Sequence, residues 1–469
     1  MTQAVVVGSG PNGLAAAITL AAEGIDVRVL EAADRAGGGT RTSELTLPGL
    51  LHDECSGFHP LSDETGFGRQ FDLGAHGLRW RWPEVQYAHV LDGGRGAAAW
   101  RSLSQTAEAL GPDQRPWQRT FGRLSDGFDA VAREFLRPML HVPRPSPAFV
   151  SFGLRALVPS SALARRFSTP EAQGLWAGVA AHAFRPFGSP LSSAIGLSLV
   201  GAGHRNGWPV AEGGSAAISR AMVSLLESLG GTVETGVTVT SLESLGSPDV
   251  VMLDLAPADV VRIAGDRLPR RVARAYGRYR HGPGAYKVEF AVAEGVPWTY
   301  EEARSAGVVH VSGDLAEVTR AEDLVHRGRM PERPFVLVGQ QYVADPSRSA
   351  GDVHPLYAYA HVPHGYSGDA TAAIEAQIER FAPGFRDRVL ARHVRTTTQM
   401  AAYNANYHGG DIVAGANDAR QLLFRPRLAL DPYATGIDGV YLCSAATPPG
   451  AGAHGMCGWN AARSALKRL

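Results

Sequence analysis

The sequence has few of the features that mark secreted, membrane-spanning or nucleic-acid-binding proteins. Its three cysteines in 469 residues are an odd number without a Cys-x-x-Cys spacing, which argues against a disulfide framework. No apolar run is long enough to span a bilayer, and lysine plus arginine equal aspartate plus glutamate at 45 each, so no basic field for nucleic acid is present. An apolar strand pattern begins at Ala4 and leaves no room for a signal peptide before it. These absences predict a soluble, cytoplasmic protein with reduced thiols and without nucleic-acid partners.

Glycine and proline are abundant but dispersed. The 55 glycines and 30 prolines do not gather in a low-complexity block, and 45% of the residues are hydrophobic. Many tight turns in a compact α/β enzyme explain this composition better than disorder does. The length favours two interleaved domains over one simple core.

The first informative stretch is a glycine-rich turn between a predicted strand, residues 4–7, and a predicted helix, residues 14–23. It reads Gly8-Ser9-Gly10-Pro11-Asn12-Gly13. Gly8 permits a tight turn, Gly10 has no side chain to hold a pyrophosphate away from the backbone, and Gly13 lets the helix pack closely on the strand. The phosphates of a dinucleotide would then bind at the helix N-terminus, where free N–H groups and the helix dipole favour anions.

A second predicted strand, residues 26–30, ends at Glu31, where a carboxylate can accept hydrogen bonds from adenosine ribose hydroxyls. A further glycine cluster follows within ten residues as Gly37-Gly38-Gly39-Thr40-Arg41. This cluster resembles the GG-x-x-R-[ST] segment of the flavin amine oxidase and phytoene desaturase superfamily. The resemblance implies that Gly38, Gly39, Thr40 and Arg41 close over the pyrophosphate of FAD, and an arginine there would compensate the phosphate charge.

The middle of the chain also resembles this superfamily. A proline- and glycine-rich turn leads into a predicted helix over residues 216–229, and residues 232–242 are predicted to form one or two strands. Val239 matches the family's V-x-x-[IL] pattern, which implies that its backbone holds the adenine. A strand over residues 250–255 is predicted to return to the same sheet.

Two other regions predict a substrate domain. Residues 107–187 have helical periodicity, and alternating segments between residues 270 and 399 predict an antiparallel sheet. Six arginines and one acidic residue lie between residues 133 and 166 among apolar side chains. A helical cap with solvated arginines and a segment lying on an anionic membrane surface both fit this pattern.

The last 65 residues carry a second glycine-rich turn between a predicted strand and a final helix beginning at Trp459. This order closely resembles the C-terminal flavin motif of phytoene desaturases and of phytoene-dehydrogenase-related oxidoreductases. By this resemblance the cofactor-binding residues are Ser444, Pro449, Gly450, Gly452, Gly455 and Met456. Ser444-Ala445 departs from the Gly-Asp or Gly-Glu of many relatives, so the predicted FAD affinity depends on whether Ser444 replaces the missing acid.

The predicted fold is α/β, a Rossmann-type FAD-binding domain interleaved with an α+β substrate domain. The predicted boundaries place residues 1–78, 206–265 and 405–469 in the first domain, and residues 79–205 and 266–404 in the second. His454, just before the final helix, is the first candidate for proton handling, and His59 is the second. No constellation with metal-ligand spacing is present.

The predicted function is FAD-dependent desaturation of a lipophilic, isoprenoid- or polyene-like substrate. Hydride would pass to flavin N5, and the electrons would leave to oxygen or a quinone, because only one nucleotide fingerprint is present and no NAD(P)H site is expected. Two alternatives remain open. One is a redox-neutral isomerase or saturase on the same scaffold, and the other is a non-catalytic lipid-binding escort protein.

Overall fold

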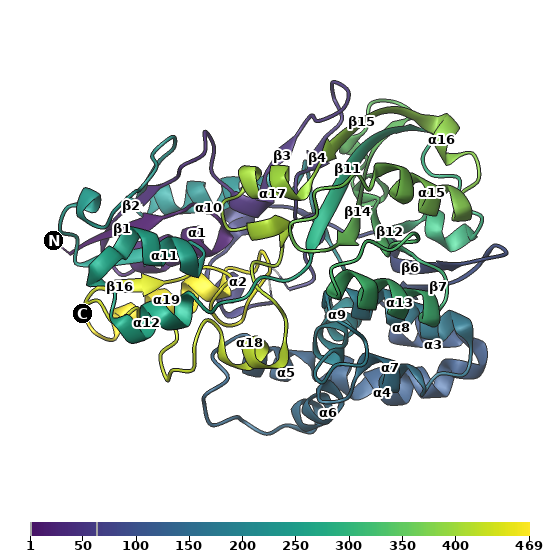
Figure 1. Cartoon of the computed structure of the whole chain (residues 1–469), viewed down its shortest axis with the longest axis horizontal. Coiled ribbons are helices and arrows are strands. Elements are labelled where there is room, and N and C mark those ends of the chain that lie inside the picture. The colour runs from purple at the N-terminus through teal and green to yellow at the C-terminus, as the bar shows by residue number, and fades with distance from the viewer. Residues whose placement is uncertain (1, 62–63) are drawn as a thin grey trace.

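The computed structural model describes residues 2–61 and 64–469. Two large sheets organise the chain, and Figure 1 shows the five-stranded sheet on the left, the seven-stranded sheet at the upper right and a group of helices below the second sheet. The two sheets and the helices match the predicted fold class, which is confirmed.

The five-stranded sheet is parallel in each of its pairings and has the order β16-β10-β1-β2-β9. Its strands are β1 (Gln3–Val7), β2 (Asp26–Leu30), β9 (Thr232–Glu234), β10 (Val250–Leu253) and β16 (Val440–Leu442). Three distant stretches of the chain therefore build one sheet.

Both faces of this sheet are covered, which explains its near-continuous apolar strands. Ala4 and Val6 of β1 point into one core with three helices, whereas Val5 and Val7 point into a separate core with two others. The first group of helices is α1 (Pro11–Ala21), α10 (Ala216–Ser228) and α19 (Met456–Leu466), and the second is α11 (Pro257–Ala264) and α12 (Arg270–Tyr276).

The seven-stranded sheet has the order β15-β11-β14-β13-β12-β6-β7 and is antiparallel except for the β12–β6 pair. Its strands are β6 (Val85–Leu91), β7 (Arg95–Trp100), β11 (Gly284–Ala293), β12 (Ala306–Val311), β13 (Val336–Gly339), β14 (Val353–Val362) and β15 (Val389–Arg395). Five of these strands lie in the region predicted to be an antiparallel sheet, and β6 and β7 are added from upstream.

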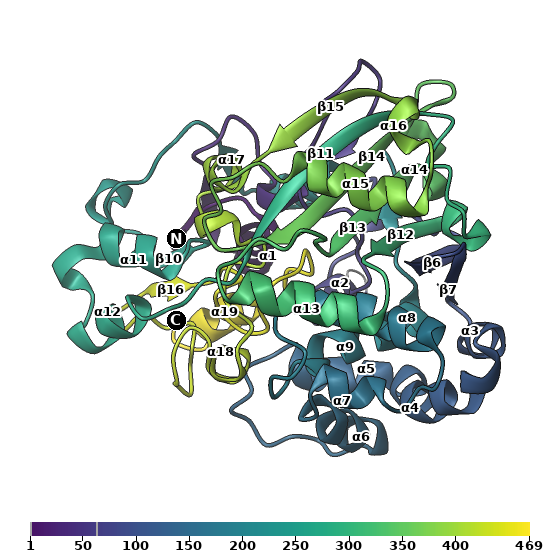
Figure 2. The same cartoon turned by 45° about the vertical axis from the view of Figure 1, so that its right-hand side comes forward.

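Helices form a cap against one face of this sheet (Figure 2). They are α3 (Leu103–Ala109), α4 (Gln114–Asp126), α5 (Phe128–Phe135), α6 (Pro147–Ala156), α7 (Ser160–Ala164), α8 (Pro170–Ala181) and α9 (Ser193–Asn206), with α13 (Leu315–His326) beside them. Gly174 and Gly178 allow α8 to approach the sheet, because a Cβ atom at either position would lie 2.7 Å from His89 or 2.5 Å from His310.

Three predicted boundaries are wrong. Helix α1 begins at Pro11 rather than at residue 14 and ends at Ala21 rather than at residue 23. Only residues 232–234 of the predicted 232–242 segment form a strand, since Gly236 has φ +74°, outside the strand region, and the chain then turns away. Helix α19 begins at Met456 rather than Trp459, because Gly455 in the left-handed conformation ends the preceding turn.

Short elements connect these layers. They are β3 (Thr42–Ser43), β4 (His52–Asp53), α2 (Gly66–Gln70), β5 (Trp80–Arg81), β8 (Val210–Ala211), α14 (Gln341–Ala344), α15 (Thr371–Phe381), α16 (Phe385–Arg388), α17 (Thr397–Tyr403) and α18 (Ala419–Phe424). Within the described residues, no helix combines the length and apolarity that crossing a bilayer requires.

Candidate cofactor and substrate site

The glycine turn lies at the carboxyl end of β1 and opens directly into α1. Gly8 has φ +97°, and its N–H donates to Leu30 O at 2.8 Å, which anchors the turn to β2. A Cβ atom on Gly10 would lie 2.7 Å from Asp254 Oδ2, and one on Gly13 would overlap the carbonyl oxygen of Gly8. These positions therefore admit only glycine without a shift of backbone or neighbours, and the predicted approach of Gly10 to a pyrophosphate stays a prediction.

The second glycine cluster folds onto the first. Gly37 donates its N–H to Ser9 O at 3.1 Å, and a Cβ atom on Gly38, whose φ is +52°, would lie 2.8 Å from Gly10 Cα. Thr40 Oγ1 donates to Gly37 O at 2.8 Å and holds the loop closed. The structure thus brings together the two segments that the sequence assigns to one pyrophosphate.

Glu31 and Arg41 lie beside these loops, both almost fully buried and 3.5 Å apart in an ion pair. Glu31 accepts hydrogen bonds from Ser9, through both its N–H and its hydroxyl, and from Ala33 N–H. The carboxylate therefore orders the turn, and its predicted contact with a ribose stays a prediction. Arg41 has a buried Nε without a partner among the described residues, so a donor remains available to an anion.

The described residues fit FAD at this place. A Cβ atom at Gly10, Gly13, Gly37, Gly38 or Gly39 would lie within 3 Å of a neighbouring atom, so the backbone of both loops is free of side chains, and the buried Arg41 Nε has no partner among the described residues. Val239 is buried near this site, and Val237 N–H donates to Glu31 O at 2.8 Å. The contact of Val239 with an adenine stays a prediction.

Asp254 is a site residue that the sequence analysis missed. It follows β10, and its Oδ2 accepts from Gly13 N–H at 3.0 Å, so a carboxyl group caps the helix that is expected to receive phosphates. Burial, aided by the charge of nearby Glu31, raises its pKa to about 7, although the hydrogen bond from the Gly13 N–H opposes the shift. Its only sequence signal is its place at the end of a predicted strand.

The C-terminal turn packs against the same loops. Ser444 Oγ donates to Leu255 O at 2.7 Å, so this hydroxyl joins two strand ends of the sheet. A Cβ atom on Gly450 would lie 2.5 Å from the buried Arg425, whose Nη1 donates to Ala445 O at 3.3 Å. The remaining predicted residues of this turn are Pro449, which follows a cis peptide bond, Gly452 with φ +139°, Gly455 with φ +68°, and Met456 at the start of α19.

His454 is 4% exposed and acts as a local capping residue. Its Nδ1 accepts from Met456 N–H at 3.1 Å, and the ring also makes a backbone hydrogen bond to Ala451. Burial lowers its pKa to about 4, so the imidazole is neutral near pH 7. The ring is therefore engaged in local structure.

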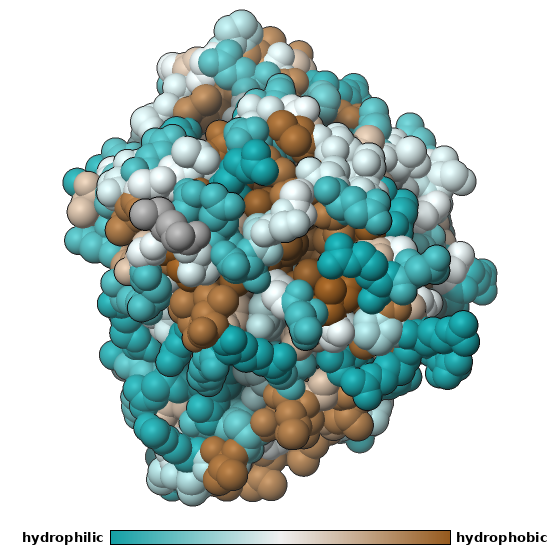
Figure 3. Space-filling model, turned by 90° about the vertical axis from the view of Figure 1, so that its left-hand side faces the viewer, coloured by the Kyte–Doolittle hydropathy of each residue, from teal (hydrophilic) through white to brown (hydrophobic). Residues whose placement is uncertain are grey.

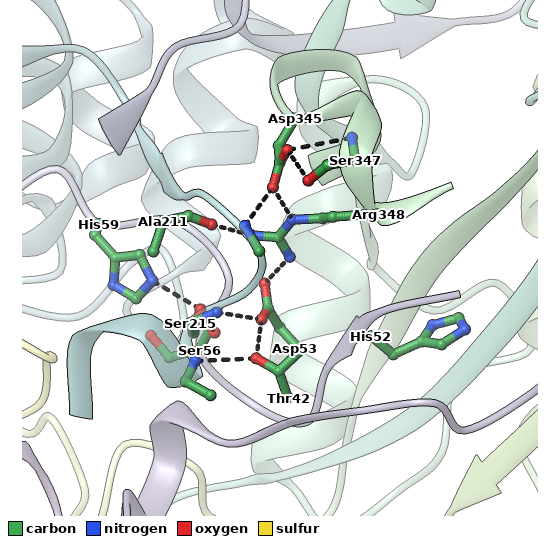
Figure 4. Close-up of polar contacts among 12 residues, drawn as sticks. Thr42, His52, Asp53, Ser56, His59, Ala211, Ser215, Asp345, Ser347 and Arg348 are labelled. Carbon is green, nitrogen blue, oxygen red and sulfur yellow. Dashed lines mark hydrogen bonds and ion pairs between the residues drawn. The ribbon is translucent and has the colours of Figure 1, made fainter. Parts of the chain in front are cut away.

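His59 joins a buried network that Figure 4 shows. Its Nε2 lies 3.0 Å from Ser215 Oγ, and that hydroxyl donates to Ser56 O at 2.6 Å. Burial lowers the pKa of His59 to about 4, against the opposing charge of Asp53. The structure therefore places His59 in the junction between the two domains and holds it neutral.

The same network is centred on Arg348, which is 0% exposed. Its Nη1 pairs with Asp53 Oδ2 at 2.5 Å, its Nε with Asp345 Oδ2 at 3.1 Å, and its Nη2 donates to Ala211 O at 2.7 Å (Figure 4). Asp53 in turn accepts from Ser215 N–H at 2.7 Å. A single guanidinium thus ties the loop after Arg41 to the substrate domain.

A buried ion pair on β11 lies next to this junction. The Lys287 ammonium pairs with Glu289, donates to Asp53 O at 2.6 Å and lies 4.5 Å from the centre of the Tyr357 ring. His52 Nδ1 lies 3.2 Å from Glu289 Oε2. Burial opposes ionisation of Glu289, but Lys287 and His52 outweigh it and lower the pKa of this carboxyl.

An aromatic ladder runs along the cap-facing side of β14. Tyr357, Tyr359 and His361 alternate on one face with ring centres 6.2 and 5.9 Å apart and nearly parallel planes. Phe184 stacks on His361 at 3.8 Å and has φ +51°, a strained value for a phenylalanine. Glu322 Oε1 lies 2.6 Å from His361 Nδ1, and His361 Nε2 is buried without a partner among the described residues.

No group of three or more histidine, cysteine, aspartate or glutamate residues with metal-binding geometry occurs in residues 2–61 and 64–469.

Comparisons with known proteins agree with this geometry. A family model for an NAD(P)-binding Rossmann-like domain matches residues 6–86. The pyridine nucleotide-disulfide oxidoreductase domain-containing protein 2 of Rattus norvegicus is 24% identical, over 99% of this chain and 93% of that protein.

Solved structures share the fold. An oxidoreductase from Methanosarcina mazei superposes with a TM-score of 0.62 at 14% identity, over 99% of this chain and 100% of that chain. A putrescine oxidase with bound putrescine gives 0.60 at 18% identity, over 100% and 98%. The chain therefore has a Rossmann-like nucleotide-binding region and the overall fold of FAD oxidoreductases, and its likeness to phytoene desaturases in particular stays a prediction.

Proposed function

We propose that this protein is an FAD-dependent oxidoreductase that dehydrogenates an uncharged, lipophilic substrate. The observation that carries the proposal is the contact between the two glycine loops at Gly10 and Gly38, beside the unpartnered Nε of Arg41. A second glycine loop and an arginine closing on the first suit a bound FAD pyrophosphate better than a freely exchanging nicotinamide nucleotide. The relative's name, an oxidoreductase domain-containing protein, supports the same class.

The charges near the site argue for a neutral substrate. Glu289 is paired with Lys287, and Asp53 is paired with Arg348. Glu54 is paired with both Arg35 and Arg395. Each of these three carboxylates already has a cationic partner, so a substrate ammonium group would have to displace one. Oxidation of a diamine such as putrescine is therefore disfavoured, although the fold is shared with a putrescine oxidase.

The aromatic ladder supports an apolar substrate. Tyr357, Tyr359 and Phe184 offer parallel rings on the cap-facing side of the sheet, and such faces bind flat or unsaturated hydrocarbon by dispersion and hydrophobic contact. Bound FAD would supply the hydride acceptor, its N5 atom. The buried Nε2 of His361 has no partner among the described residues, Glu322 orients its ring, and it belongs to the same ladder, so we assign it the proton that leaves with the hydride.

The decisive experiment is the visible spectrum of the purified protein, followed by release and mass determination of any bound ligand. Oxidised-flavin bands and released FAD are expected, with bleaching under anaerobic conditions by neutral polyenes or isoprenoids and not by putrescine. Reoxidation of the bleached protein by oxygen or by a quinone then identifies the electron acceptor. A colourless protein that takes up no added FAD would contradict the proposal and favour a lipid-binding role. Conversion of a substrate only by the reduced protein would instead indicate a redox-neutral isomerase or saturase.

A further inference from the structure

One helix of the cap exposes an apolar stripe to solvent. Ala148, Phe152 and Ala156 bury one side of α6 against neighbouring helices, as expected for an amphipathic helix. The other side exposes aliphatic rather than polar side chains: Val150 is 51% exposed, Leu154 66% and Leu157 62%. Their spacing of four and three residues places them in one row on the helix.

The loop before α6 exposes two more aliphatic side chains. Leu140 is 41% exposed and Val142 is 90% exposed, the largest exposure among the large hydrophobic residues that the structure describes. Figure 1 places α6 at the lower edge of the molecule, and Figure 3 shows apolar side chains gathered at the lower end of one face. We call these five residues, Leu140, Val142, Val150, Leu154 and Leu157, the α6 stripe.

The segment that carries the α6 stripe has an excess of arginine. Residues 115–166 contain nine arginines and three acidic residues, whereas the whole chain has no net charge. Within the described residues, only Arg137 of the nine pairs with a carboxylate. Burial and the neighbouring charges of Arg166 and Arg123 lower the pKa of Arg155, which shows that like charges are crowded here without compensation.

We propose that the α6 stripe and its arginines dock on the surface of an anionic lipid bilayer. The aliphatic side chains would enter the boundary between headgroups and acyl chains, and the arginines would bind lipid phosphates. A second copy of the chain fits this face poorly, because a symmetric contact would bring the two unpaired arginine clusters together. The proposal goes beyond the oxidoreductase activity and does not depend on bound FAD.

The test is co-flotation of the full-length protein with lipid vesicles. Binding is expected to vesicles of phosphatidylcholine with about a third phosphatidylglycerol, and to fall at least tenfold in vesicles of phosphatidylcholine alone. It should also fall as salt is raised, because added ions screen the contacts of the arginines with the lipids.

Two pairs of variants distinguish binding through the α6 stripe from unspecific adhesion to vesicles. Leu154→Ser with Leu157→Ser should weaken binding about tenfold or more, whereas Leu390→Ser, a 54% exposed leucine on β15 at the opposite end of the molecule in Figure 1, should leave it unchanged. Arg144→Gln with Arg166→Gln should remove the preference for anionic vesicles, and Arg386→Gln on α16 should not.

Three outcomes would overturn the proposal. They are equal binding to both kinds of vesicle, equal loss in the stripe variants and Leu390→Ser, and a dimer in sedimentation analysis that the Leu154→Ser and Leu157→Ser changes dissociate. The last outcome would make the α6 stripe a protein interface. Circular dichroism of each variant confirms that it is folded, since the substituted side chains are exposed.

Discussion

The two halves of the site stabilise charge in different ways. On the side of the five-stranded sheet, backbone groups dominate, because glycines admit close contacts and buried carboxyls such as Asp254 receive N–H donors. On the side of the seven-stranded sheet, side chains dominate, because Arg348 and Lys287 neutralise buried acids directly. The first half is therefore open to an added anion, whereas the second is already neutral and suits an uncharged molecule.

The largest expected effect on cofactor binding comes from a methyl group in the backbone-dominated half. Gly13→Ala would place a Cβ atom against the carbonyl of Gly8 and 3.1 Å from Asp254 Oδ2, so α1 must shift away from the turn. We expect FAD affinity to fall about a hundredfold or more, equivalent to about 3 kcal/mol, measured by quenching of flavin fluorescence. Gly188→Ala is the matched control, because a Cβ atom there has no neighbour within 4 Å. Unchanged affinity in Gly13→Ala would show that the glycine turn does not bind the cofactor.

The second expected effect is a loss of stability when the buried guanidinium of the side-chain-dominated half is removed. Arg348→Met removes the partner of Asp53 and Asp345 and leaves buried carboxylates uncompensated. Such a loss costs about 3–5 kcal/mol of unfolding free energy, which urea titration measures. Arg262→Met breaks an exposed pair with Asp259 and should cost about 0–1 kcal/mol. Similar losses in both variants would contradict the view that Arg348 joins the two domains.

The backbone-dominated half was the more predictable from sequence, for a physical reason. Residues 8–13 form one short motif and residues 37–41 another, and the glycine spacing within each motif can be recognised without knowing which distant atoms the glycines approach. Asp254, Arg348 and Lys287 instead meet partners 241, 295 and 234 residues away, so no local pattern marks them.

The two histidines chosen from sequence show a different limit. The sequence shows that both histidines lie close to cofactor-binding motifs. It does not show the hydrogen bonds of their rings, which depend on Ser215 and on the backbone of the final turn. His361 was not singled out, because its signal is only alternation within a strand, which any sheet residue shares.

The third expected effect is a pH dependence of stability that comes from Asp254 in the backbone-dominated half. The pKa of Asp254 is raised to about 7 from its ordinary value of 3.8, so the folded protein keeps a proton that the unfolded chain releases. Stability should therefore decrease as pH rises from about 4 to about 7, by up to about 4 kcal/mol, and level off above. The charge of Glu31 helps to raise the pKa of Asp254, and the charge of Asp254 in turn helps to raise the pKa of Cys443 and of Cys457.

The same proton should couple to the cofactor. If phosphates bind beside protonated Asp254, FAD affinity falls about tenfold between pH 6 and pH 8, since deprotonation adds a negative charge next to them. Asp254→Asn should remove most of this slope in both stability and affinity. Asp249→Asn should keep it, because Asp249 lies just before β10 and accepts an exposed hydrogen bond from Gln3 N–H. A slope that persists in Asp254→Asn would assign the titration to another group.

The smallest expected effect concerns His454 and decides between capping and proton transfer. His454→Ala removes the acceptor for Met456 N–H and should cost about 1 kcal/mol of stability, and His454→Asn should restore most of it, because its amide oxygen can accept the same hydrogen bond. Since the pKa of His454 is lowered to about 4, a capping role also predicts an unchanged rate profile between pH 5.5 and 8 in His454→Asn. If His454 instead transfers the substrate proton, kcat should fall about a hundredfold in both variants, whatever their stability. The asparagine variant therefore separates the two roles, and retained turnover would leave His361 as the nitrogen to test next.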